Sequence, residues 1–326
     1  MRRREFIAGI SAAAWPVVAW GQQQRLPVVG YLNAGYSGAT INFVAAFRKG
    51  LSETGFSEGR NLAIEYRFAE NQFDWLPELV AELVHRQMSV IAVLGGGLVA
   101  ALAAKAATAT IPIVFGIGDN PVEAGLVASL NRPGGNLTGT SFMIGELAPK
   151  RLELLHEMLP QATRFAMLVD PNSVKPESTI KAAEMAATAL GGRMDVLSAS
   201  TNHEIDAAFA TAVQKRTEGI LINGSQFFVN RRVQLATLAV HHAMPVIYYD
   251  RVFAESGGLM SYGSNLLDQN RQVGVYTGRI LKGEKPSDLP VMQPTKFEFV
   301  INLQIARTLG IEVPAGLLAI ADEMIE

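Results

Sequence analysis

The stretch IPIVF, residues 111–115, and its counterpart MPVIY, residues 244–248, decide the fold that the sequence predicts. Each is a short apolar run with proline in second position, and such runs between polar loops are typical of strands buried in a parallel sheet. The two stretches match in character at every position, and they close two series of similar length, 28–112 and 165–245. Two such series indicate two α/β lobes of one topology.

The segments within each series alternate between strand patterns and helix patterns. Apolar residues at 76, 79, 80, 83 and 84, for example, follow the i, i+3, i+4 spacing of an amphipathic helix. The predicted strands are 28–32, 62–68 and 90–94, then 165–169, 194–197 and 219–222, and the predicted helices are 43–51, 76–84, 99–107, 182–190 and 205–213. This alternation predicts parallel sheets that carry helices on both faces.

Small polar loops follow the predicted strands. They are residues 33–35, 95–97, 118–120, 170–172 and 223–225, and Asp250. Because parallel α/β sheets bind ligands outside the carboxyl ends of their strands, these loops are candidate ligand contacts. Two lobes that face each other across such loops enclose a cleft, so the sequence predicts a small-molecule site between the lobes.

The N-terminal 21 residues have the layout of an export signal. Three arginines at 2–4 form a basic start, an apolar stretch runs over 7–20, and Ala19 and Gly21 are the small residues expected before a cleavage site. The stretch is short for a membrane span, which needs about 20 apolar residues. The order RREFI at 3–7 resembles a twin-arginine signal, with an ordinary secretory signal as the alternative. We therefore expect a periplasmic protein from which residues 1–21 are removed.

The composition excludes several classes of protein. With 49% hydrophobic residues the chain is not disordered, and without cysteine it is neither a disulfide scaffold nor a zinc ribbon. The absence of cysteine also argues against a lipid anchor. A formal net charge of −2 without basic clusters argues against nucleic-acid binding. The sequence contains no metal-ligand spacing, nucleophile elbow or dinucleotide fingerprint. We therefore expect no cofactor.

Several longer segments carry a resemblance to a known family. They are DNPVEAGLVASL at 119–130, RPGGNLTG at 132–139, PTKFEFVINL at 294–303, ARTLG at 306–310 and ADEMI at 321–325. Together they closely resemble the ABC-transporter substrate-binding family that includes tryptophan- and tyrosine-binding members. The resemblance extends from about residue 26 to 326.

The resemblance implies the type I periplasmic binding protein fold, in which two Rossmann-like lobes with parallel sheets are joined by a three-crossover hinge. The crossovers are then expected at 138–143, at 261–264 and near 293–300. Lobe one would comprise 26–140 and about 264–295, and lobe two 141–263 and part of 296–326. Hinges of this kind absorb the backbone rotation when the lobes close.

The resemblance also implies a solute receptor that clamps a small ligand, an amino acid or an aromatic or carboxylate compound, and delivers it to an ABC permease in the inner membrane. We expect a monomer and no catalysis. One alternative is a periplasmic enzyme that uses Asp119 and Asp250 as an acid–base pair. Another is a sensing module for a membrane signalling partner.

The candidate ligand contacts come from the strand ends and the crossovers. They are Asn33, Gly35, Tyr36, Gly96 and Asp119 in lobe one, Asp170, Asn223 and Asp250 in lobe two, and Ser141 and Tyr262 in the crossovers. We expect loop N–H groups with Asn33 or Ser141 to hold a ligand carboxylate, and Asp119 or Asp250 to pair with an amino group. Tyr36 or Tyr262 would stack on an aromatic ring or cover an apolar side chain. Each residue could instead serve its own turn.

Overall fold

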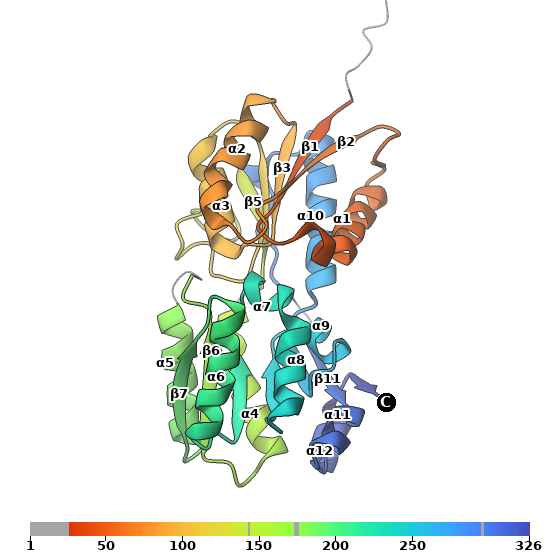
Figure 1. Cartoon of the computed structure of the whole chain (residues 1–326). Coiled ribbons are helices and arrows are strands. Elements are labelled where there is room, and N and C mark those ends of the chain that lie inside the picture. Colours follow the sequence, from red (N-terminus) through yellow and green to blue (C-terminus); the bar gives the residue numbers. More distant parts are fainter. Residues whose placement is uncertain (1–25, 143, 173–175, 295–296) are drawn as a thin grey trace, which may run out of the picture.

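The chain forms two α/β lobes that lie one above the other (Figure 1). The computed structural model describes residues 26–142, 144–172, 176–294 and 297–326. The predicted export signal, residues 1–21, lies outside the described residues. The α/β fold class with two lobes and parallel-dominated sheets, predicted from the repeat, is confirmed.

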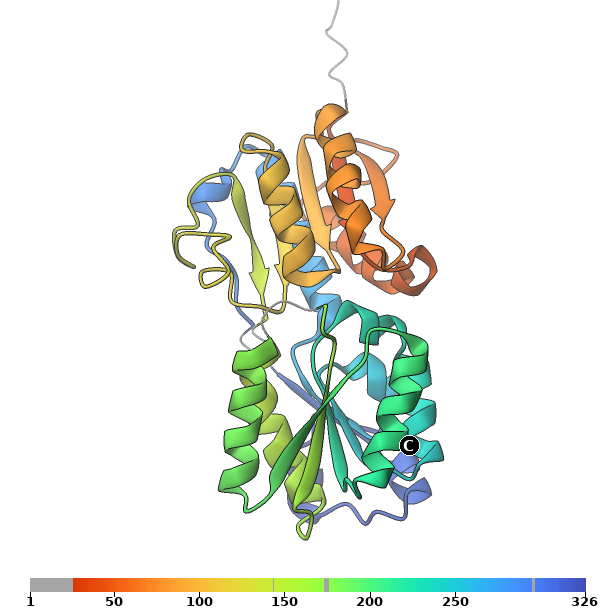
Figure 2. The same ribbon diagram turned by 60° about the vertical axis from the view of Figure 1, so that its left-hand side comes forward.

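Lobe one contains a five-stranded parallel sheet in the order β2-β1-β3-β4-β5. Its strands are β1 (Val28–Asn33), β2 (Ala63–Phe68), β3 (Val90–Leu94), β4 (Ile113–Ile117) and β5 (Leu137–Ser141). Helices α2 (Leu76–His85) and α3 (Gly97–Ala107) cover one face, in front in Figure 2, and α1 (Ile41–Glu53) and α10 (Leu266–Leu281) cover the other. An apolar cluster fills the space on each side of the sheet.

Lobe two contains a seven-stranded sheet in the order β12-β11-β10-β9-β8-β6-β7. Its strands are β6 (Arg164–Val169), β7 (Arg193–Ser198), β8 (Gly219–Ile222), β9 (Val246–Tyr248), β10 (Met260–Gly263), β11 (Glu298–Asn302) and β12 (Glu323–Ile325). Its helices are α4 (Ala148–Met158), α5 (Pro176–Ala189), α6 (Asn202–Gln214), α7 (Gln226–Asn230), α8 (Arg232–His241), α9 (Arg251–Glu255), α11 (Leu303–Thr308) and α12 (Ala315–Ile320). Strand β11 runs antiparallel to β10.

The two lobes repeat one topology. The order β7-β6-β8-β9-β10 in lobe two matches β2-β1-β3-β4-β5 in lobe one, so β4 and β9 hold equivalent places. The carbonyl of Pro112 accepts from the Ile91 N–H, and that of Pro245 accepts from the Ile220 N–H, both at 2.9 Å. Both prolines stand just before their strand, where a missing N–H removes no ladder bond. The matched proline stretches thus reflect equivalent strands.

The chain passes between the lobes three times. It leaves β5 for lobe two, returns from β10 to α10, and goes back to lobe two ahead of β11. Before the third passage, Met292 lies beside β5, where its N–H donates to Gly139 and its carbonyl accepts from Ser141, both at 2.9 Å. Met143 in the first passage and residues 295–296 in the third lie outside the described residues.

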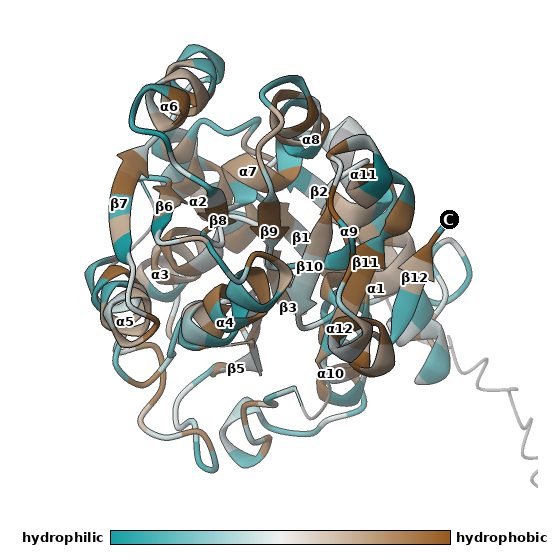
Figure 3. Ribbon diagram, turned by 90° about the horizontal axis from the view of Figure 1, so that it is seen from below, coloured by the Kyte–Doolittle hydropathy of each residue, from teal (hydrophilic) through white to brown (hydrophobic). Residues whose placement is uncertain are grey.

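Apolar side chains gather on the sheets and polar ones on the outer helix surfaces. In Figure 3 strand β9 is brown, whereas the outward turns of α6 are mostly teal. This is the pattern of sheets buried on both faces, and it explains the near-continuous apolar strands of the sequence. Within the described ranges, none of the helices is both long and apolar enough to cross a membrane.

Candidate functional site

A cavity of about 400 Å³ lies between the two lobes. Its wall is built largely from loops that follow strands of both sheets, so the carboxyl ends of the two sets of strands meet there. Five of the ten residues expected at the site line this cavity. They are Asn33, Gly96, Asp119, Asp170 and Asn223. Whether each of them touches a ligand stays a prediction.

The loop after β3 forms a tight turn at the cavity wall. Gly95, Gly96 and Gly97 have φ angles of +72°, +83° and +54°, which side-chain-bearing residues rarely adopt. A Cβ on Gly96 would lie 2.4 Å from the Cβ of Ala34, because this loop packs directly on the loop after β1. The neighbouring Asn33 accepts from the Gly35 N–H at 2.7 Å. The glycines therefore fix where helix α3 begins.

Asp119 brings an acidic group to the cavity wall from the loop after β4. Burial raises the pKa of its carboxyl to about 6, and a hydrogen bond from the Leu98 N–H opposes that rise. Leu98 lies in the first turn of α3, where the helix dipole favours a negative charge. Ser141 is fully buried behind this loop, and its hydroxyl donates to the Asp119 carbonyl at 2.7 Å.

Lobe two supplies a connected set of polar groups. The Asp170 carboxylate accepts from the Ser225 hydroxyl at 2.5 Å and from the Asn172 N–H at 2.9 Å. The Tyr249 hydroxyl donates to the Ser225 carbonyl at 2.8 Å. Ser225 also caps α7, because its oxygen accepts from the Phe227 N–H. These bonds hold the wall of lobe two in one arrangement.

The lobes touch directly beside the cavity, at a contact that we call the interlobe latch. It comprises Gly35, Tyr36 and Asn71 of lobe one with Gln226, Asn230 and Arg231 of lobe two. The Asn230 amide donates to the Asn71 side chain at 2.8 Å, and the Arg231 guanidinium lies 5.6 Å from the centre of the Tyr36 ring. Helix α7, which carries Gln226 and Asn230, lies at the boundary between the lobes in Figure 1.

Gly35 and Tyr36 thus lie at the latch and not in the cavity wall. A Cβ on Gly35 would stand 3.1 Å from the side-chain nitrogens of both Gln226 and Asn230. Tyr36 and Arg231 border a second hollow of about 470 Å³, which opens beside the first. The structure therefore places these two expected ligand contacts at the surface where the lobes meet.

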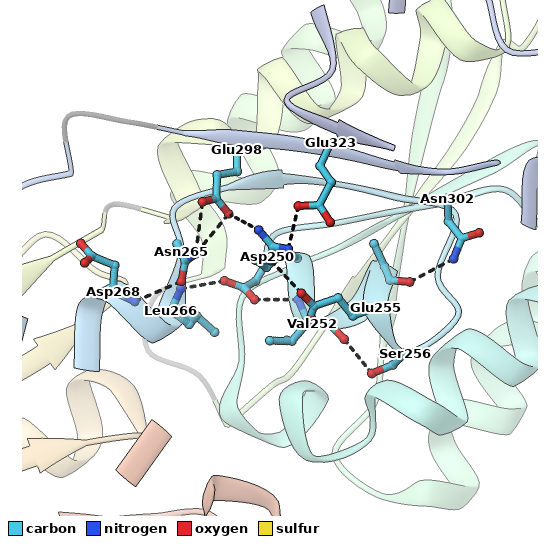
Figure 4. A network of polar contacts seen from close by, with 12 residues as sticks. Asp250, Val252, Glu255, Ser256, Asn265, Leu266, Asp268, Glu298, Asn302 and Glu323 are labelled. Atoms are coloured by element: carbon cyan, nitrogen blue, oxygen red, sulfur yellow. Dashed lines mark hydrogen bonds and ion pairs between the residues drawn. The ribbon is translucent and has the colours of Figure 1, made fainter. Parts of the chain in front are cut away.

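Asp250 and Tyr262 also lie outside the cavity lining. The Asp250 carboxylate accepts from the N–H groups of Val252 and Leu266, both at 2.9 Å, and so joins α9 to the start of α10 (Figure 4). Burial raises the pKa of Asp250 to about 7, although both of these bonds oppose the rise. Tyr262 packs near the rings of Phe297 and Phe299. These two residues and Ser141 lie beside the crossovers, and whether any of them touches a ligand stays a prediction.

Ion pairs and hydrogen bonds surround Asp250 at the second and third crossovers. Asn265, which caps α10, donates to Glu298 at 3.1 Å, and Arg251 pairs with Glu255, Glu298 and Glu323 (Figure 4). The network connects the start of α10 with the start of β11. The second and third passages between the lobes are therefore anchored to each other at lobe two.

Several lining residues were not expected from the sequence. They include three aromatic side chains, Phe43, Phe73 and Tyr249, and the apolar Ile144. Tyr249 directly follows a predicted strand, so the rule that strand ends form the site could have identified it. Phe43 belongs to the apolar face of α1 and also joins the core cluster of lobe two, a contact across the cleft that no local pattern indicates.

The described residues contain no group of three or more His, Cys, Asp or Glu side chains that could hold a metal ion. Asp119 lines the cavity but Asp250 does not, so the acid–base pair of the enzyme alternative is not assembled there. What the cavity presents is a space between the lobes with aromatic and acidic walls. Such a space suits binding.

Comparisons with known proteins agree with this geometry. A family model described as ABC transporter substrate binding protein matches residues 37–325. A tyrosine-binding protein from Clostridioides difficile is 25% identical over 266 residues, which cover 82% of this chain and 76% of that protein. A conserved domain protein from Vibrio cholerae superposes with a TM-score of 0.83 at 25% identity, over 92% of this chain and 100% of that one.

A fourth comparison concerns a structure with a bound ligand. The ABC domain from Streptococcus pneumonia in complex with L-Trp superposes with a TM-score of 0.82 at 22% identity, over 92% of this chain and 99% of that one. At this identity the likeness shows the fold. Members of the matched family are substrate-binding proteins and not enzymes. Since the family model spans nearly the whole described chain, the protein belongs to the ABC transporter substrate-binding protein family.

Proposed function

We propose that this chain is the solute receptor of an ABC importer, and that it binds an amino acid, preferably an aromatic one, between its lobes. The observation that carries the proposal is the cavity of about 400 Å³ lined by both lobes, with Phe43, Phe73 and Tyr249 in its wall. Aromatic walls favour a planar, apolar ligand group, and Asp119 suits an amino group. The tyrosine-binding relative and the L-Trp complex of a structural neighbour support the same ligand class.

The proposed mechanism is closure of the lobes around the ligand, after which an ABC permease recognises the closed form. The latch contacts stabilise the closed form without any ligand atom, and ligand contacts from both lobes add to them. A ligand shifts this equilibrium only through its higher affinity for the closed state. The fraction of free protein that is already closed therefore sets the apparent affinity, and a smaller closed fraction gives weaker apparent binding.

The first experiment identifies the ligand. Protein purified without added ligand is denatured, and the released small molecules are analysed by mass spectrometry. Thermal-shift assays with the twenty amino acids and with aromatic acids and amines follow. We expect aromatic amino acids to raise the melting temperature by binding the native state. If no small molecule is released and none of these compounds raises the melting temperature, the receptor proposal is wrong.

Loss of the latch hydrogen bond is expected to open the lobes. Asn230→Ala removes the 2.8 Å bond to Asn71, which contributes about 1 kcal/mol and so shifts the open–closed ratio about fivefold. Small-angle scattering of the free protein should show a larger radius of gyration, and ligand affinity should fall by up to about fivefold. Asn71→Ala should have the same effect, and the double variant should be no weaker than either. Losses that multiply in the double variant would contradict a direct contact.

We further propose export across the cytoplasmic membrane by residues 1–21, through the twin-arginine route. Mass spectrometry of the protein isolated from the periplasmic fraction should give an N-terminus near Gln22. Replacing Arg3 and Arg4 with lysine should strongly reduce the amount in that fraction if the twin-arginine route is used. An unchanged amount would favour the ordinary secretory route, and an intact N-terminus in the cytoplasm would contradict export.

A further inference from the structure

The charges of the cavity wall are uneven. Among the described residues that line it, Asp119, Glu123, Glu146 and Asp170 are acidic, and none is Lys, Arg or His. Asp119 is largely buried, and within the described part of the chain no cation offsets the rise in its pKa. A buried carboxylate without a counter-charge is costly, which makes a cationic ligand group favourable beside it.

Several N–H and O–H groups that could bind a ligand carboxylate already donate hydrogen bonds to acceptors within the protein. The Leu98 N–H at the start of α3 bonds to Asp119, and the Asn172 N–H bonds to Asp170. The Asn33 amide donates to the Tyr31 hydroxyl, at 3.5 Å. Ser141, which was expected to hold a carboxylate, is fully buried and donates to the Asp119 carbonyl. Each of these donors therefore already bonds to an oxygen atom of the protein and not to a ligand carboxylate.

One buried base lies behind the wall and not in it. Arg151 of α4 is fully buried, and its guanidinium donates to the carbonyl of Ile144, a wall residue, at 3.0 Å. It does not line the cavity. Its Nε and Nη1 atoms are buried and have no hydrogen-bond partner within the described part of the chain. In this arrangement the surface that meets the ligand carries acidic side chains without a basic one among the described residues.

We propose that this cavity selects its ligand by a protonated amino group held at Asp119, and that a carboxylate on the ligand is dispensable. The inference rests on the proposed function of the same site and narrows its ligand class to aromatic compounds that bear an ammonium group. Amines formed by decarboxylation of aromatic amino acids then bind, and the corresponding acids without the amino group do not.

Matched ligands test this selectivity directly. L-Tryptophan, tryptamine and 3-indolepropionate share one ring system and differ in their charged groups, as do L-tyrosine, tyramine and 3-(4-hydroxyphenyl)propionate. Isothermal titration with the full mature protein should show the amine binding within about tenfold of the amino acid. The acid should bind at least about 100-fold more weakly, because it leaves Asp119 unpaired and adds a like charge.

A conservative variant assigns the selectivity to Asp119. Asp119→Asn removes the charge but keeps an oxygen that can accept from Leu98. This variant should bind tryptamine about 100-fold more weakly than the native protein does. Its affinity for 3-indolepropionate should be unchanged or slightly higher. Asp206→Asn, which removes the same charge from an exposed site on α6, should change neither affinity by more than about twofold. Melting temperatures of both free variants that do not fall below that of the native protein would show that folding is intact.

The pH dependence offers a second readout. A pKa of about 6 for Asp119 means that its carboxyl must lose a proton before pairing with the amine at lower pH. Tryptamine affinity should therefore fall about tenfold from pH 7 to pH 5, and this fall should disappear in Asp119→Asn. The variant keeps the other acids of the wall, Asp170, Glu123 and Glu146, and the buried Arg151. Any pH dependence of the affinity that these groups cause would therefore remain in the variant.

The outcomes separate this inference from the proposed function. If an acid binds as tightly as its amine, or if tryptamine binds Asp119→Asn as well as the native protein, the inference is wrong while the receptor role stands. If no member of either ligand series binds, both the aromatic receptor role and the inference are overturned. Tight binding of amine and amino acid with weak binding of the acid supports both.

Discussion

Gly274→Ala is expected to destabilise lobe one by about 3 kcal/mol or more. A Cβ at position 274 of α10 would lie 2.1 Å from the carbonyl oxygen of Phe47 and 3.1 Å from the Cα of Gly50, both in α1. The same close crossing places a Cβ on Gly50 at 1.8 Å from the carbonyl oxygen of Arg271. Backbone atoms cannot move aside as a side chain can, so the helices must separate, and overpacking of this kind is strongly destabilising.

The loss matters for the whole architecture because α10 is the segment that returns from lobe two to lobe one. We expect the melting transition of the Gly274→Ala variant to fall by roughly 6–12 °C in calorimetry. Gly316→Ala is the matched control, since this helical glycine of α12 has no atom within 4 Å of its Cβ position. There alanine should raise stability slightly. Equal melting temperatures for the two variants would contradict the close crossing of α1 and α10.

Gly96→Ala is expected to impair both folding stability and ligand binding. The φ of +83° is unfavourable for alanine by about 1 kcal/mol, and the Cβ would lie 2.4 Å from that of Ala34. Relief of that clash moves the loop after β3, and with it the start of α3, whose Leu98 N–H holds Asp119. We expect a loss of about 3 kcal/mol in unfolding free energy and at least a tenfold loss of affinity.

Gly125→Ala separates the two causes. Gly125 has a similar φ of +67° but no atom within 4 Å of its Cβ position, so its alanine variant carries the backbone strain without the clash. Denaturant unfolding of both variants should give a loss of about 1 kcal/mol for Gly125→Ala and a clearly larger one for Gly96→Ala. Comparable losses would mean that the packing of the two loops does not restrict position 96.

Local pattern was sufficient for the repeat, for the strands of its two series and for most of the helices within them. The stretch at 111–115 predicts β4, and the one at 244–248 predicts β9, because apolar runs of that length have few alternatives in an α/β chain. The five expected residues that line the cavity, Asn33, Gly96, Asp119, Asp170 and Asn223, all directly follow a predicted strand or lie within a few residues of one. The rule that strand ends form the site therefore placed them by topology alone.

The same rule gave no means of ranking residues within a loop. Asp119 and Asp250 follow equivalent strands, β4 and β9, yet one carboxylate faces the cavity and the other bonds to Val252 and Leu266. An aspartate beside a helix start can cap it or face a ligand, and the difference is a side-chain direction that local sequence does not encode. Asp250 follows its strand directly and begins α9 at once, whereas no helix starts at Asp119.

By itself, the sequence determined what depends on neighbours along the chain: the two α/β series, their equivalent proline strands and the set of loops from which a site could be built. The tertiary structure alone decided which groups meet across the cleft. Asn71 and Asn230 are 159 residues apart in sequence, and their hydrogen bond exists because the relative position of two lobes brings them to 2.8 Å. Periodicity reports which face of a strand or helix is buried, but it carries no information about the partner that buries it.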